Sequence, residues 1–265
     1  GAGVFAILSI ALWMGIYLFQ FSLPITRISH IQWHAHEMIY GFSMAVIAGF
    51  LLTAVKNWTG VQTPHGSSLF ALFSLWMLSR ILFLFGERFI LIAAILDIIF
   101  LIGLTIAVVT PIVRVKQWKQ MMVVTQLALF IVTSSFFLLG VAGMVEQGVY
   151  WSLYGGLYLI IGLILIMGRR VIPFFIEAGV GYPVKLFNYR WVDLSSPALY
   201  LAFLVAEVLM INRYLSAFFA AALFIVTSVR LVGWHTVGIW KKPLLWSLFV
   251  AFSFIDLGFL LMALS

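Results

Sequence analysis

The chain has no cysteine, few charged residues and no long polar stretch. The lack of thiols among 265 residues excludes disulfides, thiolate metal sites and covalent haem attachment through Cys-x-x-Cys-His. Charged residues make up only 9% of the chain and hydrophobic residues 65%, with a mean hydropathy of +1.18. A soluble domain is about half apolar and about a quarter charged. We therefore expect membrane lipid to cover most of this chain.

The hydrophobic runs predict an all-α, polytopic transmembrane bundle that forms a single domain. A helix needs about 20 apolar residues to cross a bilayer, and this rule gives nine spans with a long connection at 169–193, where Pro173 is expected to break the helix. The chain starts within a hydrophobic segment, so we expect it to be part of a longer polypeptide. The predicted spans are about 3–22, 34–55, 68–85, 89–113, 121–145, 150–168, 194–212, 214–232 and 244–263.

The basic residues predict the orientation of these spans. Loops on the side where the chain starts carry eleven Lys and Arg, the opposite loops carry three, and Arg80 lies within a span. Cytoplasmic loops are enriched in Lys and Arg, so the start of the chain is predicted to be cytoplasmic. The net charge of +7 is spread over these short loops, and we therefore expect no nucleic-acid partner.

Several charged side chains are predicted to lie inside the membrane at similar depth. With a rise of about 1.5 Å per residue, Asp97 and Asp256 lie roughly 10–12 Å from the outer ends of their spans, and Arg80 and Glu207 roughly 8 Å. Arg80 and Asp97 either form an ion pair within the membrane, or Arg80 binds a carboxylate of a cofactor.

The segment Trp33-His34-Ala35-His36-Glu37-Met38 opens the second predicted span in this same layer. Residues two apart on a helix point about 200° apart, so His34 and His36 either chelate one metal from a bent backbone or serve two sites. Neutral imidazole suits copper, iron and zinc. The predicted metal ligands are His34, His36 and His235, with His30 and Met38 as weaker candidates. The acids predicted to orient a ligand or carry protons are Glu37, Asp97, Glu207 and Asp256.

Two further features allow more than one interpretation. Gly41, Ala45 and Gly49 recur every four residues, as in close helix packing, although such a stripe also makes room for a flat porphyrin. Arg169 and Arg170 either anchor the end of a span or bind a cofactor propionate or an anionic lipid. His65 lies in a short polar loop and is expected to be solvated.

Five blocks of sequence resemble the NnrS family. The first is the His-rich block with Gly41-Phe42 after it. The others are 49–60 (GFLLTAVKNWTG), Trp76 with Arg80, 168–175 (GRRVIPFF) and 243–246 (PLLW). The resemblance implies a bacterial inner-membrane protein that binds non-covalent haem b and copper and is linked to nitric oxide, through nitrosative stress or denitrification. It also implies nitric oxide or metal-nitrosyl species as partners.

Two departures from the family pattern are visible. Members usually continue into further spans with a late His-rich segment, and many carry His where this chain has Phe249. Two other functional classes stay open: a proton-coupled transporter, which also uses charged groups inside a bundle, and a non-catalytic subunit of a larger respiratory or oligomeric membrane complex.

Overall fold

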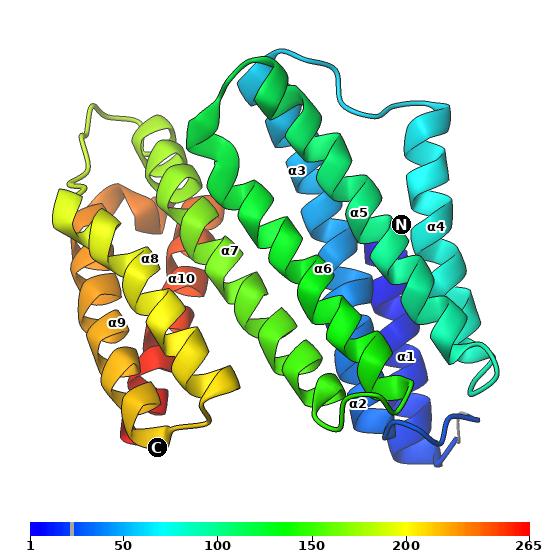
Figure 1. Cartoon of the computed structure of the whole chain (residues 1–265). Coiled ribbons are helices and arrows are strands. Elements are labelled where there is room, and N and C mark those ends of the chain that lie inside the picture. The colour runs from blue at the N-terminus through cyan, green and yellow to red at the C-terminus, as the bar shows by residue number, and fades with distance from the viewer. Residues whose placement is uncertain (22–23) are drawn as a thin grey trace. The chain divides into compact units, whose positions relative to one another are not determined.

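The computed structural model describes residues 1–21 and 24–265. The described residues contain nine helices that are long and apolar enough to cross a membrane, as predicted (Figure 1). The chain is therefore a multi-pass helical membrane protein. The helices are α1 (Ala2–Phe19), α2 with the π-helix η1 and α3 (His30–His36, Glu37–Ser43, Met44–Thr59), α4 (Ser67–Leu84), α5 (Ile90–Arg114), α6 (Met121–Val141), α7 (Gly148–Gly179), α8 with the π-helix η3 (Arg190–Leu204, Val205–Leu209), α9 (Arg213–Trp234) and α10 (Pro243–Leu264). Short 3₁₀ turns η2 (Trp118–Gln120) and η4 (Val237–Lys241) precede α6 and α10.

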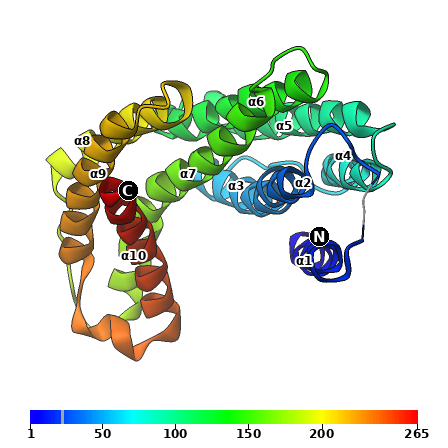
Figure 2. The same cartoon turned by 90° about the horizontal axis from the view of Figure 1, so that it is seen from below.

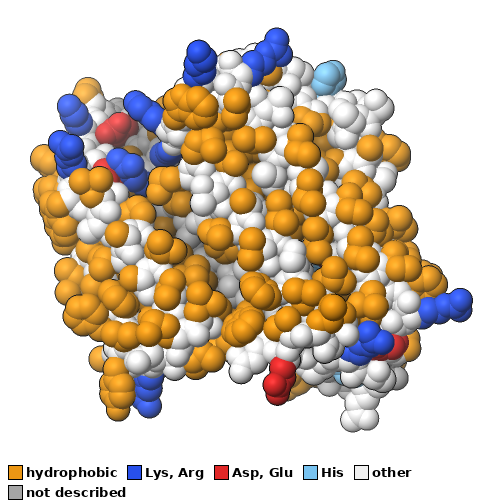
Figure 3. Space-filling view, in the orientation of Figure 1, with side chains coloured by type: hydrophobic (Ala, Val, Ile, Leu, Met, Phe, Trp, Pro, Cys, Tyr) orange, Lys and Arg blue, Asp and Glu red, His pale blue; other side chains and the backbone are white. Residues whose placement is uncertain are grey.

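The chain divides into two compact units, Gly1–Ile160 and Ile161–Ser265. In the first unit, α5 packs against α3, α4 and α6, and α1 lies against η1 (Figure 2). In the second unit, α9 packs against both α8 and α10. On the face seen in Figure 3, hydrophobic side chains cover the sides of the helices, and Lys and Arg lie near helix ends. This is the surface that a bilayer requires.

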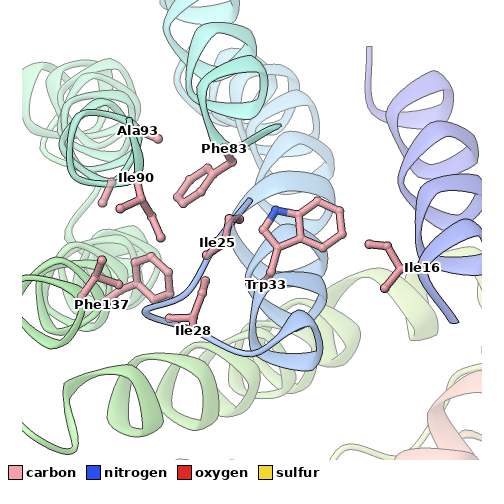
Figure 4. Close-up of a cluster of buried hydrophobic side chains, with 10 residues drawn as sticks. Ile16, Ile25, Ile28, Trp33, Phe83, Ile90, Ala93 and Phe137 are labelled. Atoms are coloured by element: carbon pink, nitrogen blue, oxygen red, sulfur yellow. The ribbon is translucent and has the colours of Figure 1, made fainter. Parts of the chain in front are cut away.

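A cluster of apolar side chains fixes the part of the first unit that carries the His-rich segment. Trp33 of α2 is 2% exposed and packs with Phe83, Ile90 and Phe137 from three other helices (Figure 4). Because Trp33 directly precedes His34, this packing sets the rotation of α2 and so the directions of the neighbouring imidazoles.

The sixth span is longer than its predicted end at residue 168, and the expected break at Pro173 is wrong. Helix α7 runs through Pro173 to Gly179. Ile172 and Ile176, one turn apart, are both buried, and a methyl group at Gly179 would lie 3.1 Å from Leu245 Cδ1. Apolar packing thus continues beyond the proline and offsets the roughly 3 kcal/mol that an internal proline costs a helix. The connection is therefore shorter than predicted, and Arg169 and Arg170 are helical.

Candidate functional site

Helix α2 begins four residues earlier than predicted because Ser29 caps it. The Gln32 amide donates to Ser29 Oγ at 3.2 Å and the Ser29 amide donates to Gln32 Oε1 at 2.8 Å. This reciprocal pair is a capping box, which satisfies two backbone donors at a helix start. His34 and His36 are therefore both helical and point to different sides of α2. Of the two alternatives, the structure supports separate surroundings for the two imidazoles.

His34 faces α1. Its ring stacks on Trp13 with centroids 4.3 Å apart and an angle of 16° between the planes. Its Nδ1 is buried and has no hydrogen-bond partner among the described residues. His30 lies one turn before it on the same helix, and Met38 lies one turn after it in the chain. His34 Nδ1 is thus a buried nitrogen without a hydrogen-bond partner among the described residues.

His36 faces the interior of the first unit and is 1% exposed. The ring centroids of Phe137, Phe83 and Tyr40 lie 4.0, 4.7 and 4.9 Å from its own. Its Nδ1 lies 3.3 Å from Glu37 Oε1, and its Nε2 lies 3.6 Å from Asp97 Oδ2. His36 is therefore held between aromatic rings and two carboxylates.

Arg80 of α4 completes a group that we call the buried charge cluster: His36, Glu37, Arg80 and Asp97. Arg80 Nη1 donates to Glu37 Oε1 at 3.0 Å, and Nη2 donates to Asp97 Oδ1 and, at 2.9 Å, to Ser79 Oγ. The Arg80–Asp97 ion pair, one of the two alternatives from the sequence, is thus present in the structure. The cluster joins three spans through fully buried polar contacts.

The backbone beside the cluster is a π-helix, which the sequence did not predict. Such segments leave carbonyls without their usual helical donors and often occur at functional sites. The Trp76 indole donates to the Gly41 carbonyl at 2.9 Å, and Ser43 Oγ donates to the Met38 carbonyl at 2.8 Å. Tyr40 donates from its hydroxyl to the Ser152 carbonyl at 2.9 Å. Trp76 and Ser43 therefore supply donors to carbonyls of η1, and Tyr40 links η1 to α7.

The other predicted site residues belong to the second unit. Asp256 Oδ2 accepts from Ser228 Oγ at 2.7 Å, and Glu207 lies in the π-helix η3. His235 follows α9, is exposed, and accepts from the Trp240 indole at 3.2 Å. Arg169 donates to Asp193 Oδ2 at 2.5 Å. The structure thus brings together Glu37, Arg80 and Asp97, and leaves Glu207, Asp256 and His235 outside the buried charge cluster.

The two imidazoles differ in the groups that they can hold. In the part of the chain that the structure describes, no three His, Asp or Glu side chains are placed to hold a metal ion. The enclosing rings leave no space for a porphyrin at His36, but its Nε2 and Asp97 Oδ2, both without hydrogen-bond partners in the described chain, suit a small ion. His34 is only partly buried and offers one nitrogen without a partner, Nδ1. One cavity of about 680 Å³ lies elsewhere, lined by Trp58, Lys116, Gln117, Trp118, Lys119 and Gln120.

Sequence comparison covers the whole chain. The model of the family described as "NnrS protein" matches residues 1–265. Comparison with curated proteins and with solved structures gives no match. The match extends over both compact units and includes the segment that carries His34 and His36. The chain belongs to the NnrS family.

Proposed function

We propose that this protein binds haem and copper in a bacterial inner membrane and takes part in the response to nitric oxide. The observation that carries the proposal is the His34 imidazole, with a buried Nδ1 that has no partner among the described residues. It lies in the segment that resembles the family most specifically. The excess of basic residues in loops on one side supports a cytoplasmic start of the chain.

Different residues of the chain would bind the metal, hold the ligating imidazole and hold the nearby carboxylates. His34 would ligate the metal or haem iron from α2, with Trp13 holding its ring by stacking. His30 and Met38 would add a nitrogen and a soft sulfur ligand for copper. Bound haem or copper would supply the redox chemistry, and nitric oxide would reach it through the apolar interior. Arg80 would hold the Glu37 and Asp97 carboxylates in place, because its two terminal nitrogens donate hydrogen bonds to them.

The test is an optical spectrum with metal analysis of the purified full-length protein. Wild type is expected to show a haem Soret band that shifts when nitric oxide is added. His34→Ala should lose this band, whereas His65→Ala, in a polar loop, should keep it. His36→Ala should keep the haem band. A colourless and metal-free wild-type preparation, or identical spectra for all variants, would remove the proposal.

A second candidate function is proton-coupled transport, which the buried charge cluster favours. Ionisable side chains inside a helical bundle commonly mark an ion or proton path. Glu37 and Asp97 are 2% and 1% exposed and belong to different spans. Substrate flux in proteoliposomes that persists after metal removal and stops in Asp97→Asn would favour this candidate over the first.

A further inference from the structure

The cavity of about 680 Å³ lies where the end of α3 meets the loop between α5 and α6 (Figure 1). Ligand sites are commonly roughly 300–1,000 Å³ in volume. Two indoles and two ammonium groups line the cavity: Trp58, Trp118, Lys116 and Lys119. None of its lining residues belongs to the buried charge cluster or to the surroundings of His34, so any ligand here is a separate one.

Hydrogen bonds fix the loop that forms one wall of the cavity. Gln117 Nε2 donates to the Trp58 carbonyl at 2.5 Å, which ties the loop to the end of α3. The Gln117 amide donates to the Ile112 carbonyl at 3.0 Å, which ties it to α5. Between these bonds Lys116 has a left-handed backbone with φ of 57°, which is uncommon for a residue with a side chain. The two lysines are thus presented by an ordered turn.

The cavity lies at the level of lipid headgroups. Helix α5 ends at Arg114 and α6 begins at Met121. The lengths of these helices, roughly 37 and 31 Å, are enough to cross a hydrocarbon core of about 30 Å. The loop between them is therefore at the membrane surface, where indoles are enriched. Trp118 is 60% exposed, so a lipid headgroup can approach the cavity beside it.

No carboxylate of the first unit lies near these lysines. The chain has no Asp or Glu at 38–86 or 98–145, ranges that include the end of α3, the loop and the adjoining parts of α5 and α6. Asp97 is separated from Arg114 by about 25 Å of helix and pairs with Arg80. Contacts of Lys119 with neutral groups leave its charge in place, so the cavity keeps a positive surplus within this unit. The other acids of the unit lie near the opposite ends of these spans: Glu37, Glu87 and Glu146.

We propose that this cavity binds the headgroup of an anionic membrane lipid, with Lys116 and Lys119 at the phosphate and the two indoles beside the glycerol backbone. A lysine ammonium binds phosphate as a point charge, and basic residues at a membrane surface attract anionic lipids. Indole rings combine an apolar body with one polar N–H, which suits the boundary between headgroup and acyl chain. The site goes beyond the proposed binding of haem and copper and does not depend on it.

The first experiment measures lipid retention by the full chain in nanodiscs of phosphatidylcholine with and without phosphatidylglycerol, by native mass spectrometry. Wild type is expected to retain phosphatidylglycerol. K116Q/K119Q should bind it about tenfold more weakly or worse, because both charges at the phosphate are lost. The matched control is K241Q/K242Q, which removes two exposed lysines outside the cavity. It should change binding by less than about threefold, because exposed charges alone contribute little.

A second measurement locates the lipid and does not need the lysine variants. Bromine on an acyl chain quenches the fluorescence of nearby tryptophan. Brominated phosphatidylglycerol should quench wild type more than brominated phosphatidylcholine at the same fraction, and Trp118→Phe should reduce this excess. Trp240→Phe, at a position 52% exposed in the second unit, is the control and should leave the excess unchanged.

Three results would overturn the proposal. One is equal retention of phosphatidylglycerol by wild type and K116Q/K119Q. Another is an equal loss in K241Q/K242Q, since the attraction would then come from surface charge alone. The third is displacement of phosphatidylglycerol by inorganic phosphate together with equal quenching by the two brominated lipids, which would assign the cavity to a soluble anion. A metal-free, colourless wild type that still retains phosphatidylglycerol would remove the proposed function and support this inference.

Discussion

Arg80 and Glu37 form a hydrogen-bonded ion pair of 3.0 Å between α4 and η1, and the two side chains are 3% and 2% exposed. The same guanidinium also pairs with Asp97 of α5. Buried ion pairs contribute less net stability than their short distances suggest, because both charges lose hydration. Removal of one partner strongly destabilises the protein, because the remaining charge stays buried without compensation.

The first prediction concerns Arg80. Arg80→Ala leaves Glu37 and Asp97 without their shared cation and should lower the free energy of unfolding by roughly 3–5 kcal/mol. Arg88→Ala, at an exposed position in the loop between α4 and α5, should change it by less than about 0.5 kcal/mol. Thermal unfolding of the purified protein in detergent measures both.

A compensating variant separates the charge effect from lost packing. Replacing the whole set, with Arg80→Met, Glu37→Gln and Asp97→Asn, removes the uncompensated charges and should recover much of the stability lost in Arg80→Ala. An Arg80→Ala protein that unfolds at the wild-type temperature would contradict this account of the cluster.

The second prediction compares two glycines of the small-residue stripe. A methyl group at Gly41 would lie 2.8 Å from the Phe5 ring and 2.9 Å from Arg80 Nη1, whereas at Gly49 it meets nothing within 4 Å in the described chain. Gly41→Ala should destabilise by about 1–3 kcal/mol through overpacking. Gly49→Ala should be neutral or stabilise by up to about 1 kcal/mol, because alanine favours helix. Equal unfolding temperatures for the two variants would show that α1 and Arg80 do not pack closely on Gly41.

The third prediction concerns pH and the loop that precedes α5. Partial desolvation of Glu87 opposes its ionisation. Two kinds of interaction outweigh this effect and lower the pKa of Glu87: hydrogen bonds from the Thr26 amide, the Arg27 amide and the Thr26 hydroxyl, and the positive charge of Arg27. A lowered folded-state pKa gives stability that is present above the ordinary carboxyl pKa of about 4.3 and is lost as pH falls through the lowered value. Wild type should therefore lose protection of the 24–29 segment from proteolysis in acid.

Glu87→Gln is the matched variant for this loop. It should show weaker protection at neutral pH and little further loss on acidification, because no carboxylate remains to be protonated. Parallel pH profiles for wild type and Glu87→Gln would contradict a role for Glu87 in holding residues 26 and 27.

The sequence was sufficient for the spans and for part of the site, for identifiable reasons. Apolar runs of membrane length determine the nine helices regardless of their tertiary packing. The similar predicted depths of Arg80 and Asp97 on consecutive spans led to the ion-pair interpretation that the structure supports. Depth alone did not reveal that Asp256 and Glu207 lie in a different unit, because depth says nothing about which helices are neighbours.

Other features depend on contacts that a local pattern does not contain. Pro173 predicts a helix end, but burial of Ile172 and Ile176 keeps α7 intact around it. The capping pair Ser29 and Gln32 was readable from the sequence and would have placed the start of α2 at His30. The π-helix was not readable, because it depends on the Trp76 indole and the Tyr40 hydroxyl finding partners on other elements.

The last prediction tests that origin of the π-helix. Trp76 is 2% exposed, and its indole donates to the Gly41 carbonyl within η1. Trp76→Phe keeps an aromatic ring but removes the indole donor and leaves the Met44 amide as the donor to this carbonyl, which should cost about 0.5–1.5 kcal/mol. Hydrogen exchange of amides 37–43 should become faster, because local opening of η1 then costs less free energy. Trp118→Phe, at a position 60% exposed, is the control and should leave exchange in η1 unchanged. If Trp76→Phe exchanges in η1 as slowly as wild type, the wide turns beside Glu37 are held by Tyr40 and Ser43 rather than by the indole, and the stabilising role assigned to Trp76 is wrong.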